Sequence, residues 1–92
     1  MRVVHDSTEV VGEEVRGGIT AIMLPSETVE LQGLVDDDSK GLEVQDWITD
    51  RIPHAWEKVV KSFNWEYEID LEYNVLSLTV CDVGDGYNEI KE

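Results

Sequence analysis

The stretch WEYEIDLEYNVLSLTVCD, residues 65–82, contains two segments in which apolar and other side chains alternate. The first segment is Trp65–Glu72 and the second is Val75–Asp82, with Tyr73 and Asn74 between them. Successive side chains of a β-strand point to opposite faces, so this alternation is typical of half-buried strands. The stretch therefore predicts a β-hairpin whose turn is Tyr73-Asn74.

A two-residue turn would fix the register of this hairpin. The apolar side chains would then form one continuous face from three facing pairs: Leu71 with Leu76, Ile69 with Leu78, and Tyr67 with Val80. A face of this kind must pack against another element to leave water.

The chain before the hairpin supplies a helix for that face. A polar turn, Asp36–Gly41, is followed by apolar residues at steps of three and four, which is the period of a helix. These are Ile48, Ile52, Ala55, Trp56, Val59 and Phe63. Pro53 has no N–H to donate, so we expect the helix to break near Arg51 to Pro53.

The first third of the chain is rich in β-branched residues and predicts short strands at Arg2–His5, Glu9–Val11 and Ile19–Leu24. Gly12 and Gly17-Gly18 separate these runs.

The segment Thr28–Val35 fits two patterns. Pro25-Ser26-Glu27 would open a helix, whereas Val29 and Leu31 alternate with polar neighbours as in a strand. We favour a strand here.

Together these segments predict an α+β fold in a single small acidic domain, residues 1–92. Its sheet would be mainly antiparallel, with about four to five strands and the hairpin at its C-terminal end. One helical segment, broken at Pro53, would pack on one face of the sheet.

The composition limits the function. With 21 acidic and 7 basic residues, the formal net charge is -14, and the basic residues are scattered along the chain. Direct binding to nucleic acid requires clustered Lys and Arg, so we expect none. The single cysteine, Cys81, permits no internal disulfide, and neither a signal peptide nor a membrane span is evident. These features indicate a cytoplasmic protein.

The first hairpin segment places a carboxylate at every position that faces away from the core: Glu66, Glu68, Asp70 and Glu72. Successive carboxylates would be about 6.8 Å apart along the strand, which is comparable to the axial advance of two phosphates on one DNA strand. Charge that keeps a sheet edge soluble and unpaired is the simpler explanation of such a row.

The distribution of charge along the chain favours a binding function over solubility alone. Residues 62–90 contain seven acids and no Lys or Arg, and residues 17–39 contain five acids and no base. Surfaces that serve solubility normally mix the two signs. We therefore add to the candidate surface Asp36, Asp37, Asp38, Asp82 and Asp85.

In this charge pattern the chain resembles the small acidic DNA-mimic inhibitors encoded by bacteriophages and mobile elements. The resemblance covers the composition and the hairpin carboxylates. It implies a non-enzymatic protein that occupies the DNA-binding surface of a host protein, such as a nucleoid-associated protein, a nuclease or a polymerase component. The short segment Ile22–Glu27 is similar to one in phage uracil-DNA glycosylase inhibitors. That family has a key glutamate before its apolar run, where this chain has Ile19-Thr20, so its target is not carried over.

A second surface is predicted on the helix, where four basic side chains share one side: Arg51, His54, Lys58 and Lys61. The simpler reading is a polar face balanced by nearby acids, and the alternative is a homodimer contact with the acidic hairpin of a second copy. Trp47 lies four residues before Arg51 and is placed to stack on it. An exposed Trp47, or Tyr87, would supply an apolar anchor for a partner.

No motif indicates an enzyme, a metal or a cofactor. Counting from Asp36 as the first position of a calcium loop puts Lys40 and Trp47 at positions that need oxygen ligands. We therefore expect a binding protein, with two alternatives to the DNA mimic. One is an immunity protein that neutralises a basic nuclease toxin, and the other is an ordinary acidic protein adapted to high salt.

Overall fold

The computed structural model describes residues 1–12, 14–52, 55–59 and 65–80. Three strands, then the helices, then two strands follow one another along the chain: β1 (Arg2–Asp6), β2 (Glu9–Val11), β3 (Glu14–Ile22), α1 (Pro25–Asp36), the 3-10 turn η1 (Asp38–Lys40), α2 (Gly41–Arg51), α3 (Ala55–Lys58), β4 (Trp65–Asp70) and β5 (Val75–Val80). An antiparallel sheet combined with helices confirms the predicted α+β class.

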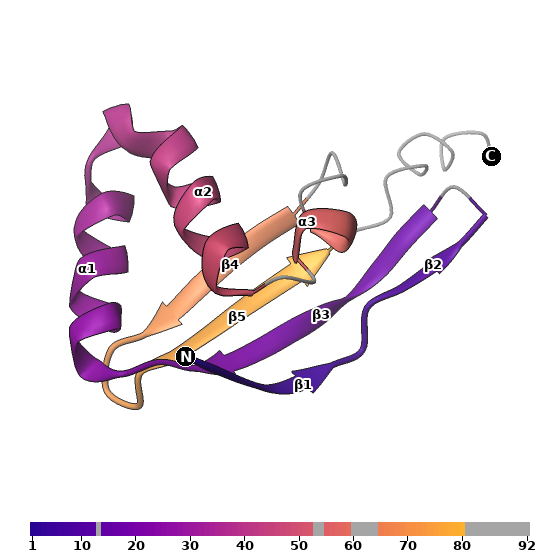
Figure 1. Cartoon of the computed structure of the whole chain (residues 1–92), viewed down its shortest axis with the longest axis horizontal. Coiled ribbons are helices and arrows are strands. Elements are labelled where there is room, and N and C mark those ends of the chain that lie inside the picture. Colours follow the sequence, from indigo (N-terminus) through magenta and orange to yellow (C-terminus); the bar gives the residue numbers. More distant parts are fainter. Residues whose placement is uncertain (13, 53–54, 60–64, 81–92) are drawn as a thin grey trace, which may run out of the picture.

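The sheet has the strand order β1-β3-β5-β4, and β2 pairs with the remaining part of β3. All of these pairings are antiparallel. β3 is therefore the shared strand, and the end of the sheet formed by β2 and β3 extends beyond α1 and α2 (Figure 1). β4 lies at the edge of the described sheet.

One face of the sheet carries the core. Ile19 and Ala21 of β3, together with Leu76 and Leu78 of β5, are at most 2% exposed. The helices cover this face with their own buried residues, which include Leu31, Val44 and Ile48. The described helices leave the opposite face of the sheet open.

The segment Thr28–Val35 is helical, so the predicted strand is wrong. Pro25 is the first residue of α1, where its missing N–H costs nothing. The Glu27 carboxylate accepts a hydrogen bond from the Leu24 N–H at 2.8 Å and so caps the first turn. Only Thr28 and Leu31 of the helix are fully buried, a spacing of three that suits a helix. These start signals outweigh the short alternation.

The hairpin is confirmed, but its turn contains four residues, Leu71 to Asn74, instead of two. Consequently Ile69 faces Leu76 and Tyr67 faces Leu78, a shift of two residues from the predicted register. An even shift leaves each side chain on its predicted face, because the side-chain period of a strand is two.

The glycines Gly17 and Gly18 lie inside β3 and do not separate strands as predicted. Here the neighbour of β3 changes from β1 to β2. Gly17 has φ of +114°, and a side chain there would collide with the backbone of Ser7. The Ser7 N–H donates to the Gly18 carbonyl oxygen at 2.9 Å. Ser7, which lies between β1 and β2, can approach β3 this closely because Gly17 has no Cβ.

The predicted helix break is confirmed, since α2 ends at Arg51 and α3 begins at Ala55. Pro53 itself lies outside the described residues. Of the predicted stripe, the buried members are Ile48, Ile52, Ala55 and Val59. The side chains of Trp56 and Phe63 are outside the description.

Two glycine substitutions test the crossing of Ser7 and β3. Gly17→Ala should destabilise the protein by more than about 1 kcal/mol, because the new Cβ meets the backbone of Ser7 at a positive φ. Gly33→Ala, at an open position inside α1, should stabilise it by about 0.5–1 kcal/mol. Urea unfolding of both variants measures these changes, and equal effects would contradict the close approach at Gly17.

The contacts of Glu27 predict that the stability of the protein depends on pH. The Leu24 N–H and the N-terminal ammonium, 3.2 Å away, hold the pKa of Glu27 below its usual value. A carboxylate with a lowered folded pKa stabilises the protein above its unfolded pKa, and this contribution disappears as pH falls through the folded pKa. Glu27→Gln should cost about 0.5–1 kcal/mol near neutral pH.

The free-energy difference between wild type and Glu27→Gln should shrink as the pH falls below about 4.5, the usual value for this carboxyl. Urea unfolding at neutral and acidic pH measures it. Glu9→Gln, exposed on β2, is the charge-matched control and should show no such convergence.

Candidate partner-binding surface

Three carboxylates occupy the outer side of the edge strand β4. Glu66, Glu68 and Asp70 are exposed and alternate with the inward-facing residues of the same strand. Their pairing partners on the neighbouring strand β5 are Thr79, Ser77 and Val75, respectively. The row is thus bordered by short neutral side chains, and its spacing along the strand is about 6.8 Å.

Glu72, the fourth carboxylate of the predicted row, lies in the turn and not on β4. Asp70 explains why the strand ends two residues earlier than predicted. Its Oδ1 accepts hydrogen bonds from the N–H groups of Glu72 at 2.9 Å and Tyr73 at 3.1 Å. Asn74 completes the turn with φ of +57°, a conformation that Asn tolerates better than most residues. Glu72 is exposed beside the end of the row.

Within the described chain, no ion pair involves the β4 carboxylates. The pairs between side chains lie elsewhere: Arg16 with Glu14 at 2.7 Å, Lys40 with Glu43 at 3.3 Å, Arg51 with Glu30 at 3.9 Å and Lys58 with Asp6 at 3.2 Å. Arg2 is on β1, three strand spacings from β4, or about 14 Å. No basic side chain among the described residues therefore cancels the negative charge of the row.

The aspartates 36–38 lie at a different place on the molecule. The Met23 N–H donates to the Asn74 carbonyl oxygen at 2.7 Å, so the hairpin turn lies beside the start of α1. Asp36 ends that 12-residue helix, about 18 Å further along it. In Figure 1 the hairpin turn lies near the start of α1, away from the end at which the chain runs on to α2. The structure does not bring these acids together with the β4 row.

Within this aspartate group, Asp37 has a local structural role. Its Oδ1 accepts hydrogen bonds from the Ser39 hydroxyl at 2.7 Å and the Ser39 N–H at 3.0 Å. These bonds lower the pKa of Asp37 from its usual value and keep it charged. Asp36 accepts from the Gln32 side chain at 2.7 Å. Asp82, Asp85 and Tyr87 lie outside the described residues.

Trp47 is 5% exposed, so it does not meet the condition for an apolar anchor at this position, which was an exposed ring. It shares the buried side of α2 with Val44 and Ile48, at helical steps of three and one. The predicted stacking is confirmed, since the Arg51 guanidinium lies 4.2 Å from the ring centroid. Burial of the ring in the core removes it from any partner contact in this conformation.

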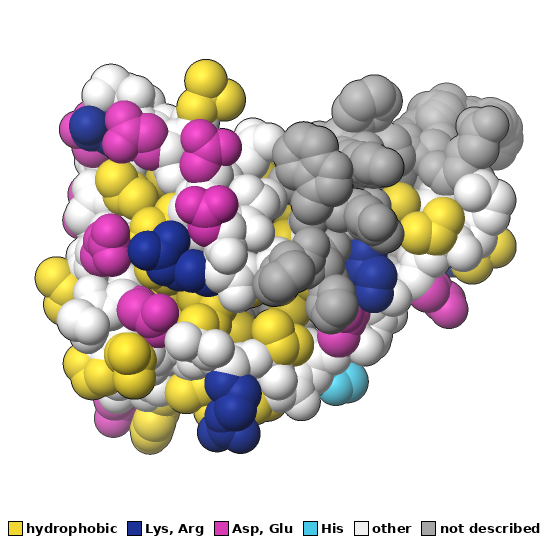
Figure 2. All heavy atoms as spheres, viewed as in Figure 1, with side chains coloured by type: hydrophobic (Ala, Val, Ile, Leu, Met, Phe, Trp, Pro, Cys, Tyr) yellow, Lys and Arg dark blue, Asp and Glu magenta, His cyan; other side chains and the backbone are white. Residues whose placement is uncertain are grey.

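Two residues of the predicted basic side of the helix are described, Arg51 and Lys58, and both contact other residues of this chain. Arg51 donates to the Trp47 carbonyl oxygen and lies near Glu30, and Lys58 pairs with Asp6. His54 and Lys61 lie outside the described residues. In Figure 2, basic side chains lie between acidic ones over α1 and α2. This arrangement favours the balanced polar face over a homodimer contact.

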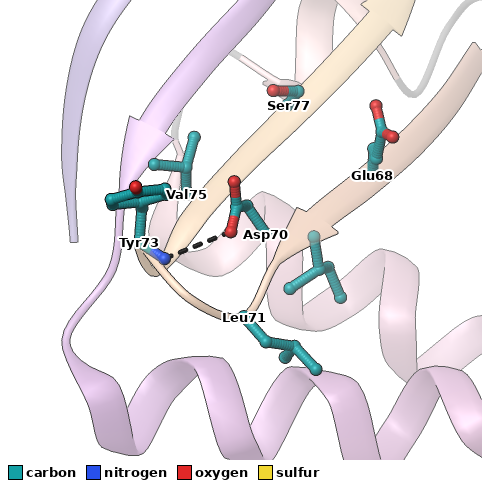
Figure 3. A pocket seen from close by; sticks show the side chains of 7 residues that line it. Glu68, Asp70, Leu71, Tyr73, Val75 and Ser77 are labelled. Carbon is teal, nitrogen blue, oxygen red and sulfur yellow. Dashed lines mark hydrogen bonds between the residues drawn. The ribbon is translucent and has the colours of Figure 1, made fainter.

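A shallow hollow of about 590 Å³ lies at the turn end of the carboxylate row. Glu68, Asp70, Tyr73, Val75 and Ser77 line it, and Figure 3 shows these side chains surrounding the same space. Tyr73, Val75 and Ser77 were not predicted as site residues. The only available signal was the alternation of the second hairpin segment, which puts Val75 and Ser77 on the side of the carboxylates.

No group of three or more His, Cys, Asp or Glu is arranged to hold a metal ion in the described ranges. No helix among the described residues is both long and apolar enough to cross a membrane. The chain matches no protein-family model, no curated protein and no solved structure. A functional assignment therefore has to rest on the surface itself.

Asp70 is expected to matter for the turn as well as for charge. Asp70→Ala should cost about 1–2 kcal/mol, because the N–H groups of Glu72 and Tyr73 lose their acceptor. Asp70→Asn keeps an acceptor oxygen and should cost less than about half as much. Urea unfolding distinguishes the two variants, and equal losses would show that the hydrogen bonds do not hold the turn.

Proposed function

We propose that this protein is a non-enzymatic DNA mimic. Its β4 carboxylates would occupy the basic DNA-binding surface of a host protein and block DNA there. The target would be a nucleoid-associated protein, a nuclease or a polymerase component. The observation that carries the proposal is the row Glu66, Glu68 and Asp70, which stands at the edge of the described sheet and forms no ion pair with any described residue. Such targets work in the cytosol, and we place this protein there as well.

The spacing of the row supports mimicry of a DNA strand. Carboxylates about 6.8 Å apart along β4 advance as far as two phosphates do along the DNA axis, so they can meet basic side chains that normally contact phosphates. The net charge of -14 adds a long-range field that speeds encounter with a basic surface. A protein carrying this field competes with DNA both in rate and in occupancy.

Charge alone would give weak binding, because an exposed ion pair contributes about 0–1 kcal/mol. An apolar anchor is needed beside the row. With Trp47 buried, the exposed turn residues Leu71, at 60%, and Tyr73, at 66%, take that role. They follow the last carboxylate of β4 directly, so a partner that contacts the row also reaches them.

The aspartates 36–38 would contribute to steering and not to the contact. They lie about 18 Å from the hairpin turn along α1. At physiological ionic strength the Debye length is about 8 Å, so these aspartates are largely screened from a partner residue bound at the β4 row.

The test is a charge-neutralised triple variant, Glu66→Gln, Glu68→Gln and Asp70→Asn. It should keep the fold and weaken displacement of DNA from a basic DNA-binding target by at least roughly tenfold. Targets are first enriched from bacterial lysate on the immobilised protein. They should be released by about 0.5 M salt, which screens exposed pairs. Fluorescence anisotropy of labelled DNA on the purified target measures displacement.

The matched control removes three exposed carboxylates elsewhere: Glu9→Gln, Asp46→Asn and Asp50→Asn. It changes the net charge equally and should weaken displacement by less than about threefold, through steering alone. Equal losses in the two triple variants would reject β4 as the binding surface. Enrichment of only neutral metabolic enzymes from lysate would reject the mimicry.

A further inference from the structure

The strand β4 has one strand neighbour in the described sheet, which is β5. On the other side of an edge strand, alternate backbone N–H and C=O groups point outwards and can pair with a further strand. The carboxylate row stands on this same strand. A partner at the row is therefore also beside backbone that pairs with no other described strand.

The inner side of β4 is incompletely covered by the described residues. Tyr67 is 37% exposed, and Trp65 and Ile69 are partly buried at the margin of the core. Their neighbours on β5, Leu76 and Leu78, are at most 2% exposed. An apolar margin thus runs along the inner side of the edge, opposite to the carboxylates.

A second copy of β4 is a poor occupant of this edge. Antiparallel pairing of two such strands would place carboxylates on directly opposing positions, about 4.5–5.5 Å apart between Cβ atoms. Like charges in that position destabilise the pair. The row therefore selects against self-association through β4 and in favour of a strand of opposite charge.

We propose that β4 binds its target by strand addition, and that the added strand alternates Lys or Arg with apolar residues. This inference rests on the proposed function and specifies the partner segment. The basic side chains would lie beside Glu66, Glu68 and Asp70, while the apolar ones would extend the inner margin at Tyr67. The backbone of the added strand would pair with the free side of β4.

The hollow beside the turn suits one of the added basic side chains. The stem of a Lys or Arg can lie on Val75 and the Tyr73 ring, with its cation near Glu68 and Asp70. The Oδ1 of Asp70 holds the turn, and the second carboxylate oxygen remains to accept from the cation. A basic side chain in this position would use Tyr73 and Val75, the lining residues that are not acidic, as an apolar support for its stem.

Three capped heptapeptides with equal composition in Lys and Val test the inference. The first alternates four Lys with three Val, and the second has the four Lys followed by the three Val. The third alternates but carries N-methyl groups on the central Val and an adjacent Lys, which blocks both strand edges. The alternating peptide should bind at least roughly tenfold more tightly than the other two, by fluorescence anisotropy.

Two further measurements separate strand pairing from simple charge attraction. The alternating peptide should slow amide hydrogen exchange in β4, as measured by NMR, and the block peptide should not. Tyr67→Ser should weaken only the alternating peptide, by roughly threefold or more. Val10→Ser, at an exposed position on β2, is the matched control and should change nothing.

The outcomes distinguish this inference from the proposed function. Equal affinity for the three peptides, lost in the β4 triple variant, would overturn strand addition and leave the DNA mimic standing. Absence of binding by all three peptides, while the protein still displaces DNA from a target, would do the same. Failure to displace DNA from any enriched basic protein would overturn the proposed function, whatever the peptides do.

Discussion

Antiparallel pairing between β3 and β5 joins the N-terminal half of the chain to the C-terminal hairpin. It places Ile19 beside Leu78 and Ala21 beside Leu76, and these four side chains form the centre of the sheet's buried face. The helices can cover the sheet only because this face is continuous. A slip of one residue in β5 would turn its apolar side chains to solvent. The outward direction of the β4 carboxylates depends on the same register.

The edge position of β4 links its charge to its chemistry. Carboxylates on a central strand would have neighbours on both sides, whereas those on β4 border only β5 in the described sheet. The same row opposes pairing with another copy of the chain and attracts basic side chains. Protection of an edge and recognition of a basic partner are therefore compatible uses of one surface, and they differ in the charge of the approaching strand.

Three local arrangements show where sequence patterns were insufficient. The alternation in Thr28–Val35 indicated a strand, but the segment is helical. The helix is capped by the hydrogen bond from the Leu24 N–H to the Glu27 carboxylate, which forms because the backbone at Leu24 is extended. The hairpin turn was fixed by hydrogen bonds to Asp70, a contact that alternation does not encode. Trp47 was predicted to stack on Arg51, and does, but the pattern did not reveal that its ring is buried in the core.

The amino-acid sequence by itself determined the α+β class, the hairpin, the helix break near Pro53 and the outward side of Glu66, Glu68 and Asp70. The class, the hairpin and the outward side of these carboxylates follow from the local periods of strand and helix, and the break follows from the missing N–H of Pro53. Only the tertiary structure decided that β4 lies at the edge of the described sheet and that the aspartates 36–38 lie apart from it. Strand order and the separation of surfaces arise from long-range pairing and packing, which no local period specifies.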